Sequence, residues 1–202
     1  KKNKRLKRLI VSTEDEKNKK ISKKYGAEIL FNRPEELSQD NTPEWLVWKH
    51  AINFLESNNY DHLDALVILP ATSPLRYQKD VDNALDLFEE GGCDAVISVK
   101  RASRNPYFNM TKINSKNFSE IVLKPDINIF NRQNAPQIYD MATVVYVVSI
   151  NHLKKNNHLF EGLVKQIMIP EERAIDIDNN FDFEIAEILL KKNNYKIEDD
   201  KD

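Results

Sequence analysis

The sequence predicts an α/β fold with a mostly parallel sheet and helices on both of its faces. Three observations predict this class: strand and helix patterns alternate, the connections between them are short, and residues 66–69 (LVIL) form an uninterrupted apolar run. Such a run is typical of a strand buried on both faces, as the strands of parallel sheets are. Alternating strands and helices with short connections are typical of the same architecture.

Composition limits the classes of function. The 202 residues, 41% of them hydrophobic, suffice for one domain with a sizeable core. The formal net charge of -2 gives no support for binding to nucleic acid or to an anionic membrane. No apolar run approaches the ~18–20 residues needed to cross a bilayer. Cys93 is the single cysteine, so no internal disulfide can form, and we expect a cytoplasmic protein.

The first elements are a strand at residues 9–12, a helix at 13–25 and a second strand at 28–31. The residues TEDE can cap the start of the helix, and Gly26 can end it in a left-handed conformation. The loop around Arg33 follows the second strand directly. Because ligands of parallel sheets bind beyond the carboxyl ends of the strands, this loop is a site candidate.

Thr42 and Pro43 form an N-cap and N1 pair for the next helix, since proline at N1 sacrifices no helical hydrogen bond. The buried strand then ends in residues 70–76 (PATSPLR), which we call the 70–76 loop and which is too rich in proline to stay in a sheet. A helix at 78–90 and a strand at 95–99 follow. The 70–76 loop is the second site candidate at a strand end.

Residues 100–140 break the alternation, because they are polar, contain several prolines and have only short strand patterns. A structureless loop of that length is unusual in a compact domain, so they form either a lid or an arm that pairs with something else. Strand patterns return at 143–148 and 167–169. We expect one domain over residues 1–192 and a frayed, charged tail at 193–202.

Residues 174–178 (AIDID) alternate apolar and acidic side chains at the period of a strand. Asp176 and Asp178 would then share one face, with Cα atoms about 6–7 Å apart, near enough for both carboxylates to hold one hydrated Mg²⁺. Ile175 and Ile177 would face the core.

A helix is expected directly after this acidic strand, with Asn180 as its cap and with Asp182 and Glu184 at its positive end. Its apolar stripe would comprise Phe181, Ile185, Ile188 and Leu189. Paired carboxylates at a strand end that leads into a helix are a plausible Mg²⁺ site at the edge of a sheet. The alternative is a solvated acidic strand end, because short motifs often match by chance.

Several common site motifs are absent. The sequence has no Gly-x-Gly-x-x-Gly or Walker phosphate loop, its four histidines lack metal-ligand spacing, and Ser73 lacks the flanking glycines of a nucleophile elbow. Loop arginines are more suggestive, because guanidinium binds phosphate or carboxylate through two parallel hydrogen bonds. Any one of them is more often a surface residue; they are Arg33, Arg76, Arg104 and Arg132.

Five stretches together resemble a known family: residues 11–15 (VSTED), 33–37 (RPEEL), 70–76 (PATSPLR), 132–136 (RQNAP) and 174–183 (AIDIDNNFDF). In this order, and with Tyr139 and Tyr146 after the fourth stretch, they resemble the CMP-sialic acid synthetases, the acylneuraminate cytidylyltransferases. The resemblance covers essentially the whole chain. It implies a Rossmann-like fold of the nucleotide-diphosphosugar transferase type and a homodimer, with residues 100–140 as the dimerisation arm.

The resemblance also implies a reaction. The anomeric hydroxyl of a nonulosonic acid, a nine-carbon 2-keto sugar acid, attacks the α-phosphate of CTP, pyrophosphate leaves, and a CMP-sugar forms. This chemistry needs an in-line approach, charge neutralisation on the triphosphate and a clamp on the sugar carboxylate. By position, the family's roles fall on Asp176 and Asp178 for catalysis and Mg²⁺, on Arg33, Ser73 and Arg76 for CTP, and on Arg132, Gln133 and Tyr146 for the sugar.

Departures from the family pattern leave alternatives open. Pro70-Ala71 stands where many members have glutamine, and Ala142-Thr143 stands where many have Asn-Gly, so the exact nonulosonic acid is open. Nothing matches the family's opening strand and glycine-rich triphosphate loop, so we expect that the sequence lacks an N-terminal segment. The alternatives are a cytidylyltransferase for 3-deoxy-manno-octulosonate, an eight-carbon acid, and a non-catalytic dimerisation or regulatory module of the same fold.

Overall fold

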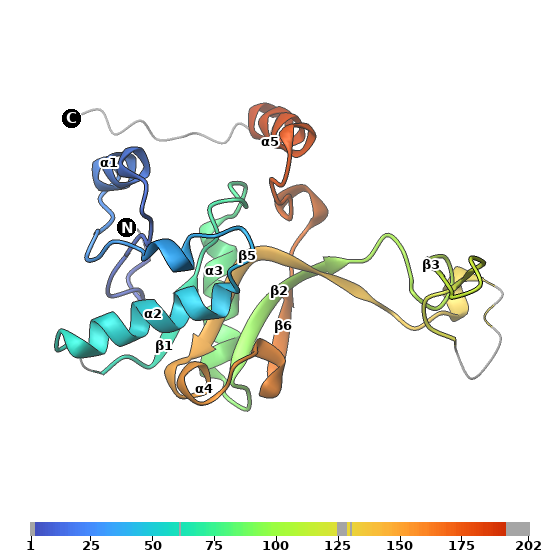
Figure 1. Cartoon of the computed structure of the whole chain (residues 1–202), viewed down its shortest axis with the longest axis horizontal. Helices are drawn as coiled ribbons and strands as arrows, with labels where there is room; N and C mark the ends of the chain where they lie inside the picture. The colour runs from blue at the N-terminus through green and yellow to red at the C-terminus, as the bar shows by residue number, and fades with distance from the viewer. Residues whose placement is uncertain (1–2, 61, 125–128, 130, 193–202) are drawn as a thin grey trace. The chain divides into compact units, whose positions relative to one another are not determined.

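A computed structural model describes residues 3–60, 62–124, 129 and 131–192 (Figure 1). The described residues form two compact units. The first takes its residues from Lys1–Ile68, Gln78–Val96 and Tyr146–Lys165, and the second takes them from Leu69–Tyr77, Ile97–Val145 and Gln166–Asp202. Arg33 and Tyr146 therefore belong to the first unit, and the other predicted site residues belong to the second.

Helix α1 (Glu16–Lys24) is the first helix of the first unit. The Asp15 side chain caps it by accepting a 2.6 Å hydrogen bond from the backbone N–H of Asn18. Gly26 follows its end at φ 76°, in the left-handed region that glycine adopts without strain. The predicted start and stop signals are confirmed.

The two strands predicted at residues 9–12 and 28–31 are wrong as regular strands. Ile10 and Glu28 form one isolated parallel bridge, and the N–H of Val11 donates a 3.0 Å hydrogen bond to the carbonyl oxygen of Glu28. These segments are paired in parallel, but the pairing is too short to make a ladder.

Helices α2 (Glu44–Ser57), α3 (Gln78–Glu89) and α4 (Ile150–Lys155) also belong to the first unit. Figure 1 draws α2 in front of the strands of this unit and α3 behind them, in agreement with helices on both faces. Pro43 occupies the cap position of α2, so this helix begins one residue later than predicted. The sequence analysis missed α4, because it follows a strand without a break.

The larger sheet has the strand order β1-β5-β2-β6. Within the first unit, β1 pairs antiparallel with the end of β5, from Ala65 opposite Ser149 to Ile68 opposite Tyr146. The α/β class is confirmed, but this pair is antiparallel where alternation alone had predicted parallel neighbours. The strands are β1 (Ala65–Ile68), β2 (Ala95–Arg101), β5 (Tyr139–Ser149) and β6 (Val164–Met168).

Burial differs between the strands. Strand β1 is half-buried along its length, not buried on both faces as predicted, because it stands at the edge of the strand order. Strands β2 and β5 carry the core instead. Their buried aliphatic residues are Ala95, Val96, Ile97, Val99, Val144, Val145, Val147 and Val148.

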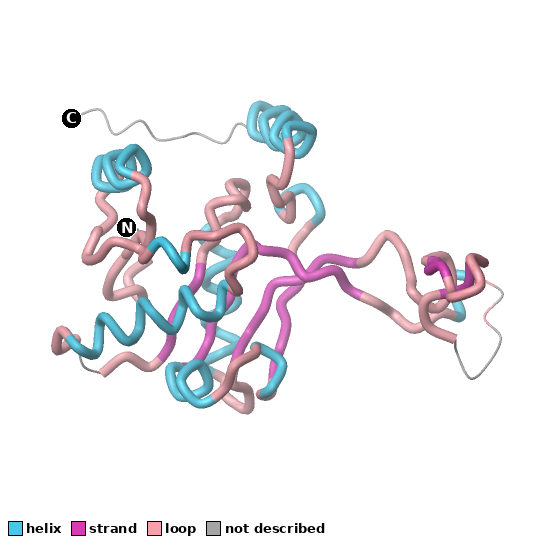
Figure 2. The backbone as a smooth tube through the Cα atoms, in the orientation of Figure 1, coloured by secondary structure: helices cyan, strands magenta, loops and turns pink. Residues whose placement is uncertain are grey.

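Residues 100–140 of the second unit contain an antiparallel hairpin of β3 (Thr111–Ile113) and β4 (Ser119–Ile121). Its turn is organised by Asn114, whose side-chain oxygen accepts hydrogen bonds from the N–H groups of Lys116 and Phe118. Figure 2 shows a long connection between strand β2 and this hairpin. We call residues 100–140 the arm; its residues 125–128 and 130 lie outside the described residues.

The acidic segment, residues 174–179, is not the strand that its alternation predicted. A 3-10 helix (Glu171–Arg173) precedes it, and the segment itself is irregular. The N–H of Ile177 donates a 2.9 Å hydrogen bond to the carbonyl oxygen of Thr72, a loop residue, instead of joining a sheet ladder. Ile175 and Ile177 are half-buried.

Helix α5 (Asn180–Lys192) follows the acidic segment as predicted. Its cap is Asn179 rather than Asn180, because the Asn179 side-chain oxygen accepts hydrogen bonds from the N–H groups of Phe181 and Asp182. The predicted apolar stripe is only partly covered: Ile185 and Leu189 are half-buried, whereas Phe181 is 68% exposed and Ile188 is 63% exposed. The predicted tail at 193–202 lies outside the described residues. In the described part of the chain, no helix is long and apolar enough to cross a membrane.

Candidate functional site

The 70–76 loop of the second unit is held together by Arg76. Its guanidinium donates to the carbonyl oxygens of Pro70 and of Ser73, the latter at 3.0 Å, and its Nε donates to the carbonyl oxygen of Val144 at 3.0 Å. The rigid fork of N–H donors suits several fixed carbonyl groups at once. Arg76 therefore fixes the conformation of the loop and connects it to β5 through hydrogen bonds.

Ser73 lies inside the same loop and is fully buried, with 0% exposure. Its Oγ lies 2.7 Å from the Oγ1 of Thr143, so the two hydroxyls share a hydrogen bond. Ser73 was predicted to bind CTP, and that role stays a prediction. The described geometry gives its hydroxyl a protein partner.

Asp176 of the acidic segment has one carboxylate oxygen that lacks a hydrogen-bond partner among the described residues. This oxygen, Oδ1, is buried. A buried carboxylate oxygen without a partner costs free energy that a cation would recover. The N–H of the next residue, Ile177, donates a hydrogen bond to the carbonyl oxygen of Thr72, so the backbone that follows Asp176 contacts the 70–76 loop.

Asp178 is exposed, and its backbone N–H donates a 3.1 Å hydrogen bond to Oδ2 of Asp182. Among the described residues, no group of three or more histidines, cysteines, aspartates or glutamates is arranged to hold a metal ion. Mg²⁺ keeps several waters and typically takes one or two protein carboxylates together with phosphate oxygens, so the unpartnered carboxylate oxygen of Asp176 suits it. The strand face that Asp176 and Asp178 were predicted to share is absent, and their joint binding of Mg²⁺ stays a prediction.

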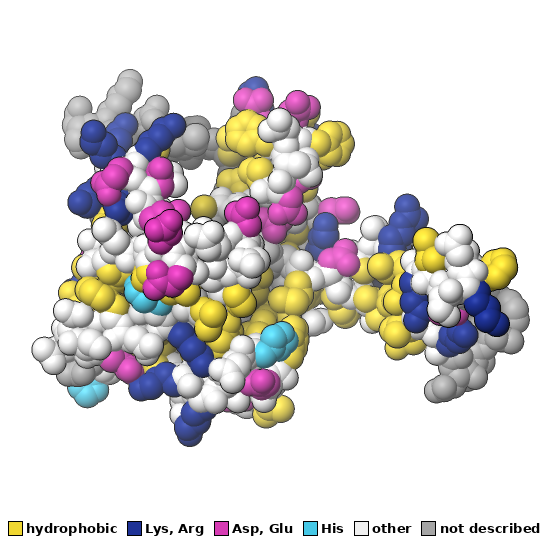
Figure 3. Space-filling model, viewed as in Figure 1, with side chains coloured by type: hydrophobic (Ala, Val, Ile, Leu, Met, Phe, Trp, Pro, Cys, Tyr) yellow, Lys and Arg dark blue, Asp and Glu magenta, His cyan; other side chains and the backbone are white. Residues whose placement is uncertain are grey.

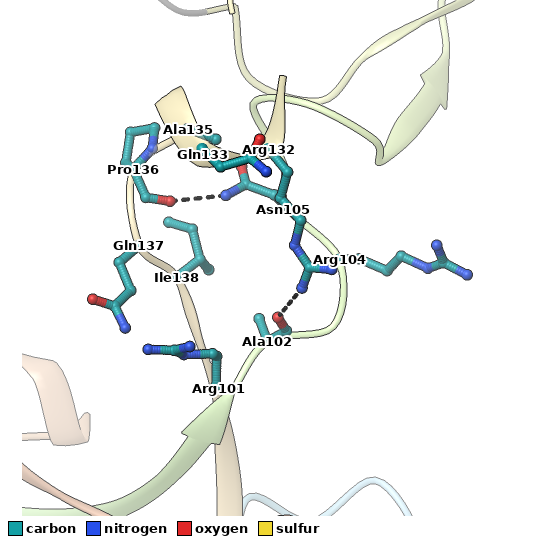
Figure 4. Close-up of a pocket in the computed structure, with 10 residues that line it drawn as sticks. All are labelled: Arg101, Ala102, Arg104, Asn105, Arg132, Gln133, Ala135, Pro136, Gln137 and Ile138. Atoms are coloured by element: carbon teal, nitrogen blue, oxygen red, sulfur yellow. Dashed lines mark hydrogen bonds between the residues drawn. The ribbon is translucent and has the colours of Figure 1, made fainter. Parts of the chain in front are cut away.

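A pocket of about 280 Å³ lies where the arm leaves β2 and β5 (Figure 4). We call it the arginine pocket, because Arg101, Arg104 and Arg132 are among its lining residues. None of the described residues that line it is acidic. Guanidinium groups without lining carboxylates favour an anionic ligand.

The side chains of the arginine pocket point in different directions (Figure 4). Arg132, in a 3-10 helix (Arg132–Asn134), extends into the pocket and donates a 3.4 Å hydrogen bond to the carbonyl oxygen of Ala102. Ile138 faces it from the other wall, and Arg104 points away from the pocket. The pocket therefore offers a cationic group opposite an apolar wall. Gln133, predicted with Arg132, also lines it.

In the first unit, Arg33 lies against the segment that precedes α1. Its guanidinium donates to the carbonyl oxygen of Ser12 and, at 3.3 Å, to the Ser12 hydroxyl. The pKa of the Glu14 carboxyl lies below its ordinary value, because its own backbone N–H and the Ser38 hydroxyl donate to it and the positive charge of Arg33 adds to the effect. Arg33 is thus held beside an anionic neighbour.

Tyr146 is 5% exposed, and its ring centroid lies 5.5 Å from that of Trp48. Its predicted contact with the sugar stays a prediction. Sequence reasoning missed Thr143 and the pocket residues Arg101 and Gln137. Arg101 ends strand β2, and the rule that sites form beyond strand ends could have found it. Nothing in the sequence pairs Thr143 with Ser73.

Comparison with known proteins gives relatives over nearly the whole chain, although no family model matches it. Post-translational flagellin modification protein B of Campylobacter coli is 31% identical over 199 residues, which are 98% of this chain and 83% of the relative. CMP-N,N'-diacetyllegionaminic acid synthase of Campylobacter jejuni is 31% identical over 96% of this chain and 81% of its own length. N-acylneuraminate cytidylyltransferase of Escherichia coli is 28% identical over 95% of this chain and 44% of its own length.

Two solved structures share the fold. The CMP:2-keto-3-deoxy-manno-octonic acid synthetase in complex with CTP aligns with a TM-score of 0.63 at 11% identity, covering 95% of this chain and 84% of that chain. The 4-diphosphocytidyl-2C-methyl-D-erythritol synthase of Anaerococcus prevotii aligns with a TM-score of 0.62 at 13% identity, over 94% of this chain and 81% of that chain. Both belong to the nucleotide-diphosphosugar transferase fold, so the predicted fold type is confirmed.

Proposed function

The chain belongs to the CMP-sialic acid synthetase family, and from this premise we propose that it transfers the CMP group of CTP to a nonulosonic acid. The relatives named as a CMP-N,N'-diacetyllegionaminic acid synthase and an N-acylneuraminate cytidylyltransferase support this class of substrate. The structural observation that carries the proposal is the buried, unpartnered Oδ1 of Asp176 beside the 70–76 loop. An unpartnered carboxylate oxygen can bind a cation, and the family resemblance predicts a nucleotide-binding role for the loop that contacts the next residue, Ile177.

The proposed reaction forms a bond between the anomeric oxygen of the sugar acid and the α-phosphorus of CTP. The bond from that phosphorus to the bridging oxygen of the β-phosphate breaks, and pyrophosphate departs with the electron pair. The proton of the anomeric hydroxyl passes to solvent water. The negative charge of the triphosphate must be neutralised for this displacement to proceed. The carboxylates of Asp176 and Asp178 would by themselves repel the negatively charged phosphates. A cation must therefore lie between the carboxylates and the phosphates.

Mg²⁺ is the cation that we propose, held by Asp176 and Asp178. When bound, it would screen the triphosphate and stabilise the charge that develops on pyrophosphate. Oδ1 of Asp176 is the first candidate ligand atom, because it is buried and unpartnered. Asp178 is exposed and would meet the cation from the solvent side.

For the nucleotide, we propose that the 70–76 loop forms one wall of the site. Its two arginine-bonded carbonyl groups and the buried Ser73 make the loop a fixed surface rather than a flexible one. Arg33 lies in the first unit, and its predicted role in nucleotide binding stays a prediction. Its guanidinium already bonds Ser12, so binding a phosphate would use its remaining N–H groups.

For the sugar acid, we propose that the arginine pocket takes the carboxylate. Arg132 extends into the pocket, and its planar fork matches a carboxylate through two parallel hydrogen bonds. The apolar wall of Ile138 suits a non-polar substituent such as an acyl methyl group. Gln133 supplies polar groups at the rim. Tyr146 keeps its proposed sugar-binding role.

We further propose that the arm forms the contact of a homodimer. Its hairpin exposes large apolar side chains: Ile113 is 72% exposed and Phe118 is 68% exposed. Figure 3 shows hydrophobic side chains on this part of the surface with Lys and Arg between them. A two-stranded hairpin is marginally stable alone, so a second copy that covers this face would stabilise it.

The alternatives have less support. The eight-carbon substrate, 3-deoxy-manno-octulosonate, is suggested only by the solved synthetase at 11% identity, a likeness that shows the fold alone. The relatives at 31% identity include a synthase for a nine-carbon acid. A non-catalytic module would have no need for the unpartnered carboxylate of Asp176.

The test is pyrophosphate release from CTP in the presence of Mg²⁺ and one sugar acid at a time. The panel comprises N-acetylneuraminate, N,N'-diacetyllegionaminate, pseudaminate and 3-deoxy-manno-octulosonate, with ATP, GTP and UTP as control nucleotides. We expect release with CTP and at least one nine-carbon acid, and none with the other nucleotides. Nucleotide binding without release for any acid would favour the non-catalytic module, and release with the eight-carbon acid alone would establish the other alternative.

A further inference from the structure

Thr143 of strand β5 joins this strand to the 70–76 loop through its side-chain hydroxyl. Its Oγ1 lies 2.7 Å from the Oγ of Ser73, a normal distance between two hydroxyl oxygens. Ser73 is fully buried, so no solvent can replace this partner. The next residue of the strand, Val144, accepts the hydrogen bond from Nε of Arg76.

We propose that Thr143 is a positioning residue for the CTP and Mg²⁺ site: its hydroxyl fixes the 70–76 loop through Ser73, and the loop in turn fixes Asp176. This inference rests on the proposed function, because it assigns the loop and Asp176 to CTP and Mg²⁺. Thr143 itself touches no reacting atom. It acts through Ser73 and Thr72.

The loop depends on such side-chain contacts because it has little regular structure of its own. It carries two prolines, Pro70 and Pro74, which cannot donate backbone hydrogen bonds. The N–H of Ser73 reaches the carbonyl oxygen of Pro70 only at 3.4 Å, a weak turn bond. The hydroxyl of Thr143 and the guanidinium of Arg76 therefore set where the loop lies on β5.

The position of the loop is passed to the acidic segment by one backbone hydrogen bond. Thr72 directly precedes Ser73, and its carbonyl oxygen accepts the N–H of Ile177 at 2.9 Å. Ile177 directly follows Asp176, whose Oδ1 is the buried, unpartnered oxygen. A displacement of Ser73 would therefore move Thr72, release Ile177 and shift the carboxylate of Asp176.

Three variants of the full-length protein separate positioning from ordinary stability. Thr143→Val keeps the shape of the side chain and removes the hydroxyl, so that Ser73 is buried without its partner. Thr143→Ser keeps the hydroxyl and removes only a methyl group. Ser98→Ala is the matched control: Ser98 is fully buried on β2, donates to the carbonyl oxygen of Ala142 and accepts from the N–H of Val145. It removes a hydroxyl that is bonded to the same strand but not to the loop.

Kinetics give the first readout. Thr143→Val should raise the KM for CTP and the Mg²⁺ concentration for half-maximal rate by about tenfold, the size expected when a buried hydroxyl loses its partner. The KM for the sugar acid should stay within about twofold, because none of the residues that line the arginine pocket belongs to the loop. Thr143→Ser should restore both values, and Ser98→Ala should lower the melting temperature without moving either.

Amide exchange gives a readout that does not require activity. The N–H of Ile177 reports its bond to Thr72 directly, so its hydrogen exchange should be about tenfold faster in Thr143→Val than in the wild type, Thr143→Ser or Ser98→Ala. Equal exchange at Ile177 in Thr143→Val and Ser98→Ala would overturn the inference. If the wild type released no pyrophosphate with any sugar acid, the proposed function would fail, whereas the exchange at Ile177 would still decide whether Thr143 holds the loop.

Discussion

Asn179 and Asp182 cap helix α5 by exchanging hydrogen bonds. The side-chain oxygen of Asn179 accepts the N–H of Asp182 at 3.2 Å, and Oδ2 of Asp182 accepts the N–H of Asn179 at 3.2 Å. This reciprocal pair satisfies donors at the start of the helix that have no partner within it. The same Oδ2 also accepts the N–H of Asp178, so the start of the helix holds one of the two candidate Mg²⁺ ligands.

The first prediction follows from this capping pair. Asp182→Ala should lower the free energy of unfolding by about 1 kcal/mol, the usual effect of losing a cap, and raise the Mg²⁺ requirement of the enzyme because Asp178 loses its backbone anchor. Chemical denaturation and a Mg²⁺ titration measure the two effects. Glu184→Gln, which removes an exposed charge from the same helix, is the control and should change neither by much. An unchanged Mg²⁺ requirement in Asp182→Ala would show that the cap of α5 does not position Asp178 for Mg²⁺ binding.

The second prediction concerns the two candidate ligands. Asp176→Asn and Asp178→Asn should each lower kcat by at least about a hundredfold while the protein stays folded. Each variant would bind Mg²⁺ poorly, so the negative charge of the triphosphate would not be neutralised. Circular dichroism checks the fold, and Asp40→Asn, an exposed loop aspartate of the first unit, is the control. Wild-type turnover in the presence of EDTA would remove the Mg²⁺ assignment.

The third prediction tests the arginine pocket. Arg132→Lys keeps the charge but loses the planar fork, so the KM for the sugar acid should rise about tenfold while the KM for CTP stays within twofold. Arg104→Lys is the matched control, because Arg104 lines the same pocket but points away from it. Steady-state kinetics with each substrate varied in turn decide the question. Equal effects on both KM values, or equal effects of both variants, would place the sugar carboxylate elsewhere.

Local signals predicted most of the helices. Helix α1 was found from its acidic start and from Gly26, and helix α2 was found from Thr42 and Pro43. Each of these signals acts within a few residues, so no tertiary contact was needed to read it. Helix α4 was not predicted, because its N-cap residue, Ser149, is also the last residue of β5 and no loop separates the two elements.

The errors arise where distant residues decide the local structure. Residues 174–178 have the alternation of a strand, yet Ile177 gives its N–H to Thr72, more than a hundred residues earlier in the chain. The predicted CTP-binding role of Ser73 stays a prediction, but the sequence did not show that its hydroxyl pairs with Thr143. A single sequence shows which residue types are present but not which of them meet across the fold. The sequence could therefore name candidate residues for the site, while their contact partners came from the structure.

The last prediction concerns the arm. Phe118 projects from the hairpin turn and is 68% exposed, an unusual state for a large aromatic side chain unless another surface covers it. Phe118→Asp should convert a dimer into a monomer, because a charge buried in an apolar contact is costly without a partner. Ser115→Asp, in the same turn, adds the same charge without removing apolar surface and should stay dimeric. Light scattering of the full-length protein measures both masses. If the proposed dimer also completes the sugar site, Phe118→Asp should raise the KM for the sugar acid, and a fully active wild-type monomer would contradict the dimer altogether.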